Sequence, residues 1–233
     1  MLASGAKKKP TALTFFSSAA IVRGMKPEPT GAQAPRKGAR TRQRIVREAA
    51  GLFNTRGFAG TSVSDVSAAT GLEKGGVYNH FGSKDDLALA AFDYAAALIH
   101  TRLAAAVRAH PDGVGRLRGM FDVYRTLSEQ PFIAGGCPIL NTAVDADDTH
   151  PALRERARSA MDVWLRLVAE ALEAGDAAGQ FRPGLDVTAV AGTIVAALEG
   201  GILLARLYRD AGWMHAVIGQ MSGYVDSLRT PAA

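Results

Sequence analysis

TRQRIVREAAGLFNTRGFAGTSVSDVSAATGLEKGGVYNHFGSKDDL, the stretch from Thr41 to Leu87, contains the pattern on which the fold prediction rests. Apolar residues recur at three- and four-residue intervals from Ile45 to Phe53, with arginines between them, which is the period of an amphipathic helix. Gly57 follows as a C-terminal stop. The sequence therefore predicts a first helix over about Thr41 to Arg56.

Two short helices are predicted next. Ser62 and Asp65 stand three residues apart and form a capping-box-like start, in which both side chains bind free backbone N–H groups. Gly71 ends this helix, and a third is expected from Lys74 to Phe81. Two short helices joined by a tight glycine turn, behind a longer amphipathic helix, make a helix-turn-helix unit whose last helix can enter the DNA major groove.

This stretch resembles the DNA-binding domain of TetR-type transcriptional regulators. The resemblance covers about a fifth of the chain and implies a cytoplasmic homodimeric repressor of a palindromic operator in double-stranded DNA, released by a small-molecule effector. The motifs that carry it stand in family order: Gly57-Phe58, Thr61-Ser62, Val66-Ser67, Gly71, Lys74-Gly75, Tyr78-x-His80-Phe81 and Ser83-Lys84 with Leu87.

Chemistry suggests a role for several residues of these motifs. Thr61 with Ser62, and Ser83 with Lys84, stand at helix N-termini, where hydroxyls and free backbone N–H groups favour phosphate. Lys74 opens the third helix and can bind guanine acceptors. Three further residues of that helix are expected at base edges, the glycines by permitting close approach: Gly75, Gly76 and Asn79.

The resemblance implies further phosphate contacts. They come from Tyr78 and His80, and from the basic arm through Arg40, Arg42 and Arg44. Taken alone, Tyr78 also fits a core aromatic residue with a surface hydroxyl, and His80 a packing residue; the surrounding pattern favours the DNA contacts. Val77 and Phe81 are assigned to the core beneath the helix, and Glu73 departs from the small hydroxyl residue often found at this helix start, which leaves the base contacts open.

Charge is distributed unevenly along the chain. Residues 1–86 contain 14 basic and 6 acidic residues, whereas residues 87–233 contain 13 and 16. A basic front segment indicates an anionic partner, with nucleic acid or a membrane surface as the candidates. The single cysteine, Cys137, excludes an intrachain disulfide and a multi-cysteine zinc site, which fits a reducing, cytoplasmic compartment.

The chain of 233 residues divides into three predicted parts. Residues 1–39 lack an amphipathic period and are expected to be a disordered tail, with Met25 as the natural start favoured over a secretory signal. Residues 40–86 form the helix-turn-helix DNA-binding domain, and residues 87–233 a helical effector-binding and dimerisation domain. The fold class is therefore all-α. The expected C-terminal helices are 87–106, 115–128, 138–146, 151–174, 186–208 and 213–228.

The penultimate helix is apolar nearly all round, with Glu199 its only charge between Val187 and Ala205. A membrane span competes with a buried helix, but Glu199 would cost about 2.5 to 3.5 kcal/mol at a bilayer centre, so we expect no membrane partner. With the last helix it resembles the pair through which family members dimerise as a four-helix bundle. The expected interface residues are Ala191, Ile194, Leu198, Ile202, Trp213, Val217 and Tyr224.

Effector binding is implied by the resemblance. The predicted apolar pocket is lined by Phe121, Tyr124, Phe132, Cys137, Asn141 and Trp164, each of which alone also fits an ordinary core position. Cys137 is interpreted as a packing residue in preference to an electrophile sensor, because no basic residue adjoins it in the sequence.

Two other kinds of site are disfavoured. Asp145, Asp147, Asp148 and His150 suggest a metal site, but acidic residues before Pro151 fit a helix start, so we expect no metal and no cofactor. A hydrolase using Cys137 and His150 is the alternative function; it lacks an orienting group and an oxyanion motif, so we expect no catalytic residues.

Overall fold

The structure of the protein is a computed structural model that describes residues 37–231. The expected tail up to residue 36, Met25 included, lies outside the described residues. Residues 37–39, which were assigned to that tail, instead begin the first described helix. The described helices are α2 (Lys37–Arg56), α3 (Val63–Thr70), α4 (Lys74–Tyr78), α5 (Lys84–Ala109), α6 (Gly113–Glu129), α7 (Pro138–Ala146), α8 (Pro151–Ala177), α9 (Val187–Tyr208) and α10 (Gly212–Ser227).

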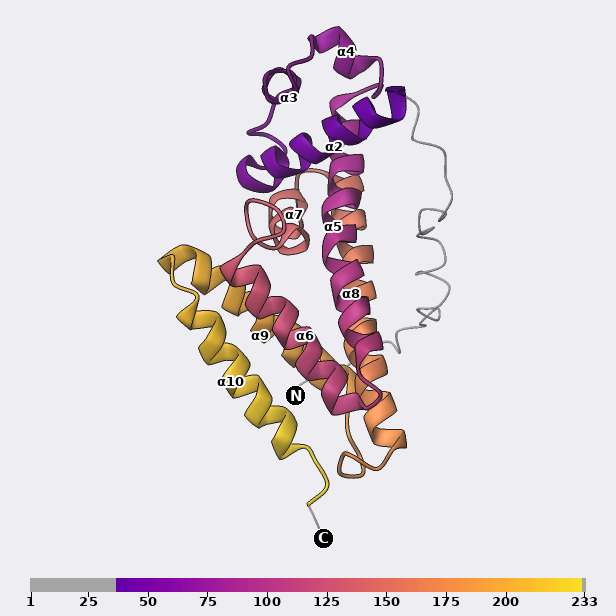
Figure 1. Ribbon diagram of the computed structural model, residues 1–233, viewed down its shortest axis with the longest axis vertical. Helices are drawn as coiled ribbons and strands as arrows, with labels where there is room; N and C mark the ends of the chain where they lie inside the picture. Colours follow the sequence, from indigo (N-terminus) through magenta and orange to yellow (C-terminus); the bar gives the residue numbers. More distant parts are fainter. Residues whose placement is uncertain (1–36, 232–233) are drawn as a thin grey trace, which may run out of the picture.

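The all-α prediction is confirmed. Between residues 37 and 231 no β-strand forms, and the only β-type pairing there is an isolated bridge between Phe181 and Arg229. The expected helices all form, with ends that differ by up to four residues; the third ends at Tyr78 instead of Phe81. Figure 1 shows α2, α3 and α4 at one end, α5 running from them along the body beside α8, and α7 beneath α2.

Local sequence chemistry sets the ends of the short helices. Ser62 caps α3 by accepting a hydrogen bond from the Asp65 N–H, while the Asp65 carboxylate accepts from the Ser62 N–H, so the predicted capping box is present. Gly71 ends α3 at a φ of 67°, a left-handed conformation that favours glycine. Ser83 caps α5 through the Asp86 N–H.

Two hydrophobic cores are joined by α5. The smaller core lies among α2, α3, α4 and the start of α5, and contains Val77 and Phe81 at 1% and 4% exposure, as predicted. The larger core fills the body around Tyr124 and Trp164. By length and composition alone, α5 and α9 are apolar enough to cross a membrane, but about half of each apolar window is buried against other helices, which fits core helices of a soluble protein.

Candidate functional site

Helix α4 presents polar groups outward from one end of the molecule. Val77 anchors its inner face, while Lys74, Gly75 and Asn79 are exposed and Tyr78 is half exposed. A Cβ at Gly75 would meet no atom within 4 Å, and one at Gly76 would make ordinary contact at 3.7 Å. Packing within residues 37–231 therefore requires neither glycine, which leaves close approach of a partner as a reason for them.

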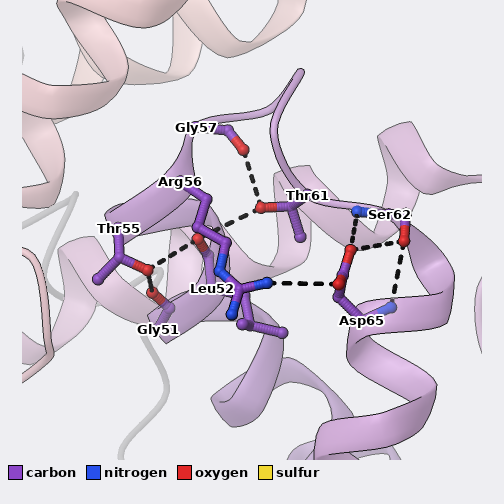
Figure 2. Close-up of polar contacts among 8 residues, drawn as sticks. All are labelled: Gly51, Leu52, Thr55, Arg56, Gly57, Thr61, Ser62 and Asp65. Atoms are coloured by element: carbon purple, nitrogen blue, oxygen red, sulfur yellow. Dashed lines mark hydrogen bonds and ion pairs between the residues drawn. The ribbon is translucent and has the colours of Figure 1, made fainter.

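The connection between α2 and α3 is internally hydrogen bonded, as Figure 2 shows. The Thr61 hydroxyl donates to the Gly57 carbonyl at 2.9 Å and to the Leu52 carbonyl at 3.3 Å, and the side chain is 1% exposed. The prediction that Thr61 contacts phosphate is therefore wrong, because its hydroxyl closes this turn from inside. Ser62 remains exposed.

The Ser62 hydroxyl also affects its neighbour Asp65. Hydrogen bonds from Ser62 lower the pKa of the Asp65 carboxyl, and Arg56, with Nη1 3.3 Å from Oδ1, contributes less. Asp65 is thus held as an anion at the N-terminus of α3, where the helix dipole also favours negative charge. Ser62, the exposed candidate for a phosphate contact, is therefore held in place by its hydrogen bonds with Asp65.

Cationic side chains lie on α2 and at the start of α5, the helices before and after α3 and α4 in the chain. Arg40, Arg42 and Arg44 are exposed on α2, and the Arg42 guanidinium lies 4.6 Å from the centre of the Phe81 ring. Lys84 Nζ lies 4.1 Å from the Phe58 ring centre at the start of α5. Within residues 37–231, none of these cations has a carboxylate within ion-pair distance. His80 and Gly76 are partly exposed.

A polar seam ties this end of the molecule to the loop before α7. The buried Asn54 donates through Nδ2 to the carbonyls of Ala134, at 2.7 Å, and Gly136, at 3.1 Å. Asn141 of α7 donates to the Asn54 side-chain oxygen at 3.0 Å and to the Gly135 carbonyl at 2.7 Å. Gly135 has a φ of 107°, and a Cβ there would lie 2.6 Å from the Asn54 carbonyl oxygen, so glycine is required at this position.

The second part of the seam involves Asp145 and His150, two of the residues that suggested a metal site. The Asp145 carboxylate accepts a hydrogen bond from the Phe58 N–H at 2.8 Å, and the Phe58 ring meets His150 edge-on at 4.5 Å. His150, rather than Asp148 or Thr149, caps α8 by accepting from the Leu153 N–H. These residues therefore have structural partners.

Two cavities adjoin α7. The first has a volume of about 580 Å³ and lies between α2, α5 and α7, with Phe53, Phe58 and Phe92 among its lining residues. The second has a volume of about 560 Å³ and lies between α8 and α9. Of the six residues predicted to line a pocket, Asn141 lines the first cavity, and neither cavity is lined by Phe121, Tyr124, Phe132, Cys137 or Trp164.

The reason for this difference is that the predicted pocket is packed. The Tyr124 and Trp164 rings stack with centroids 4.8 Å apart, and Phe121 and Cys137 are each 1% exposed. Phe132 instead lies outside this stack, under the Arg102 guanidinium. Aromatic residues at helical spacing were therefore core residues rather than cavity walls.

Glu199 is the site residue that sequence reasoning did not select. It is 6% exposed, and it receives hydrogen bonds from the Cys137 thiol and from the Tyr124 hydroxyl, the latter at 3.4 Å. Burial raises the pKa of the Glu199 carboxyl to about 7 and raises the pKa of the Cys137 thiol well above its usual value. The available signal was that Glu199 is the only charged residue between Val187 and Ala205.

The predicted dimer residues fall into two groups. Ala191, Ile194, Leu198 and Ile202 are at most 3% exposed and face the protein's own core, so their assignment to an interface was wrong. Trp213 is 42% exposed and stacks on Tyr208, while Val217 and Tyr224 are half-buried. Large apolar side chains are exposed on another face of α9, at Leu203 and Leu207.

Comparisons with known proteins agree with this arrangement. Residues 45–91 match the family model described as bacterial regulatory proteins, tetR family, and residues 113–221 match a tetracyclin repressor-like C-terminal domain. A TetR transcriptional regulator from Chloroflexus aurantiacus J-10-FL is 44% identical, with a TM-score of 0.81 over 85% of this chain and 100% of that one.

Curated relatives point the same way. An uncharacterized HTH-type transcriptional regulator of Mycobacterium tuberculosis (strain CDC 1551 / Oshkosh) is 33% identical over 72% of this chain and 86% of its own. The HTH-type transcriptional repressor DhaR of Mycobacterium sp. (strain GP1) is 28% identical over 72% of this chain and 84% of its own.

Proposed function

The chain belongs to the TetR family of transcriptional regulators, and from that premise we propose that it is a homodimeric, cytoplasmic repressor that binds a palindromic operator and leaves it when a small molecule binds. Members of this family bind DNA operators and small-molecule effectors and form dimers. They are generally not enzymes, and we assign no catalytic residue. Cys137 and His150, the pair required by the hydrolase alternative, take different partners.

The DNA-binding role of α4 rests on one observation. Its outward face is polar and cationic, and packing among the described residues does not require glycine at Gly75 or Gly76. We propose that Lys74, Gly75, Gly76 and Asn79 approach the bases. The phosphate contacts then come from Ser62, Tyr78, His80 and Lys84, with Arg40, Arg42 and Arg44 on the flank.

We assign dimerisation to the exposed apolar ridge of α9, defined by Ala189, Thr193, Ala196, Leu203 and Leu207, together with Trp213 of α10. These residues are exposed in the single chain, and the large apolar members are of the kind that interfaces bury. A two-fold pair of such ridges would set two α4 helices on successive major grooves.

A footprint of the full chain on the DNA upstream of its own gene tests the proposed function. We expect one protected, two-fold symmetric sequence with half-sites about one helical turn, or a multiple of it, apart. Fluorescence anisotropy with that sequence and a scrambled duplex should show tighter binding to the former by at least about a thousandfold. Equal affinity for both duplexes, or no protection anywhere, would refute the role.

A further inference from the structure

The first cavity, between α2, α5 and α7, lies where the helix-turn-helix unit meets the rest of the molecule. Helix α2 belongs to that unit, and Figure 1 shows α7 beneath it. The volume of about 580 Å³ lies in the range of sites for small molecules. Of the α9 ridge assigned to the dimer, Leu203 alone lines this cavity, so its walls come almost entirely from other helices of one protomer.

Apolar side chains make most of the wall. Phe53 and Phe58 come from the end of α2 and the turn after it, and their rings stack with centroids 6.2 Å apart at an interplanar angle of 13°. Helix α5 contributes Phe92 and otherwise only small side chains, which are Ala88, Ala91 and Ala95. Phenyl rings favour an occupant that has its own aromatic ring, because ring pairs contribute beyond the apolar area that they bury.

The charged residues of the wall do not call for a charged occupant. Arg56 and Asp145 are the only two in the lining, and their charges are opposite. Arg56 is paired with Asp65, with Nη1 3.3 Å from Oδ1, and the Asp145 carboxylate accepts from the Phe58 N–H at 2.8 Å. A charge carried into this apolar space would lose water without gaining a free counter-charge, so the cavity favours an uncharged molecule.

The cavity also borders the polar seam. Asn54 and Asn141, which are joined by a hydrogen bond of 3.0 Å, both line it. Phe58 and Asp145, the other pair joined across the seam, line it as well. An occupant therefore lies between the same two surfaces that these bonds join, and its fit depends on the spacing of α2 and α7. A molecule whose affinity depends on that spacing shifts the orientation of the helix-turn-helix unit.

We propose that the first cavity is the effector site and that it takes an uncharged, mainly apolar molecule with an aromatic ring. The ring packs beside Phe53 and Phe92, and the bound molecule sets the spacing of α2 and α7 so that the two α4 helices of a dimer no longer fit successive major grooves. This inference rests on the proposed function, because it names the effector class of that regulator.

Three matched probes test the preference for an uncharged molecule: 4-biphenylmethanol, 4-biphenylmethylamine and 4-biphenylcarboxylate. They are titrated calorimetrically into the full chain at pH 7. We expect the alcohol to bind at least about tenfold more tightly than the amine and the carboxylate, because both charged analogues leave an unpaired charge in an apolar space. Equal or tighter binding of either charged analogue would contradict the proposal.

Two variants test the location. Phe53→Ala removes an aromatic ring from the wall, and Leu140→Trp adds bulk to it; each should weaken binding of the alcohol at least about tenfold while circular dichroism stays unchanged. Phe132→Ala is the control for the first, since Phe132 is a partly exposed phenylalanine that lines neither cavity. Leu165→Trp is the control for the second, because Leu165 lines only the cavity between α8 and α9.

Both controls should bind the alcohol as the wild type does. Loss of binding in Leu165→Trp but not in Phe53→Ala would place the molecule in the other cavity and overturn the proposal.

Operator binding, measured in parallel, separates this inference from the proposed function. Saturating alcohol should lower the operator affinity of the wild type at least about fivefold, and the effect should be lost in Phe53→Ala and Leu140→Trp. If the wild type binds its operator but does not bind the alcohol, or binds both independently, the effector site is refuted and the repressor role stands. If no operator is bound, the proposed function fails and the effector role of the cavity fails with it.

Discussion

At the scale of single residues, Glu199 is expected to make stability depend on pH. Burial raises the pKa of its carboxyl to about 7, above the value of 4.5 for the unfolded chain, so the native state holds this proton more tightly. The stabilisation is present below pH 4.5 and is lost as pH rises through 7, which amounts to about 3.5 kcal/mol at 1.4 kcal/mol per pKa unit. Urea denaturation at pH 5 and pH 8 should show that Glu199→Gln removes this loss. A variant that follows the wild-type pH profile would contradict the prediction.

A second residue-scale prediction separates two lysines by role. Lys74 is exposed on α4, whereas Lys84 lies over the Phe58 ring at the start of α5. Lys74→Ala should therefore relax base preference at one operator position by about 1–3 kcal/mol. Lys84→Ala should weaken operator and random DNA alike and reduce the salt slope by about one charge. Equal losses on both duplexes for Lys74→Ala, in titrations at several salt concentrations, would show that it does not read bases.

Single residues also show which contacts could be predicted from the sequence and which could not. Ser62, Asp65 and Ser83 were predictable because caps depend on neighbours within one helical turn. The direction of Thr61 was not, because its partner carbonyls belong to the preceding helix and turn, and are reached only after the chain reverses.

At the scale of elements, the Asn54–Asn141 hydrogen bond joins α2 to α7. Asn54→Ala removes the donor to two buried carbonyls and leaves the Asn141 amide with fewer partners, so we expect a loss of about 1–3 kcal/mol in unfolding free energy. Thr55→Ala, an exposed neighbour on α2, should change it by less than about 0.5 kcal/mol. Chemical denaturation measures both, and equal effects would mean that the seam contributes no stability.

The positions of the helices could be predicted from the sequence, but which face of α9 packs into the core could not. Hydrophobic periodicity located α5 to α10 because it depends on the sequence alone. In α9, however, two faces are apolar: one with Ile194 and Leu198, the other with Leu203 and Leu207. Periodicity cannot tell which of two apolar faces meets its own core, and packing against α6, α8 and α10 decided it.

At the scale of the whole molecule, these two faces make opposite predictions for the same substitution. Ile194 is fully buried, so Ile194→Asp places an unpaired charge in the core and should unfold the protomer. Leu207 is 69% exposed and lines neither cavity, so Leu207→Asp should leave the protomer folded, with unchanged helicity by circular dichroism. In a dimer paired through the α9 ridge, that charge would be buried without a partner and should weaken the dimer by more than about tenfold. Sedimentation should then find a folded monomer that has lost affinity for the two-fold operator but still binds DNA weakly. Thr188→Asp, exposed on the first turn of α9, is the control and should remain dimeric. A Leu207→Asp protein with wild-type dimer affinity would place the interface on another surface.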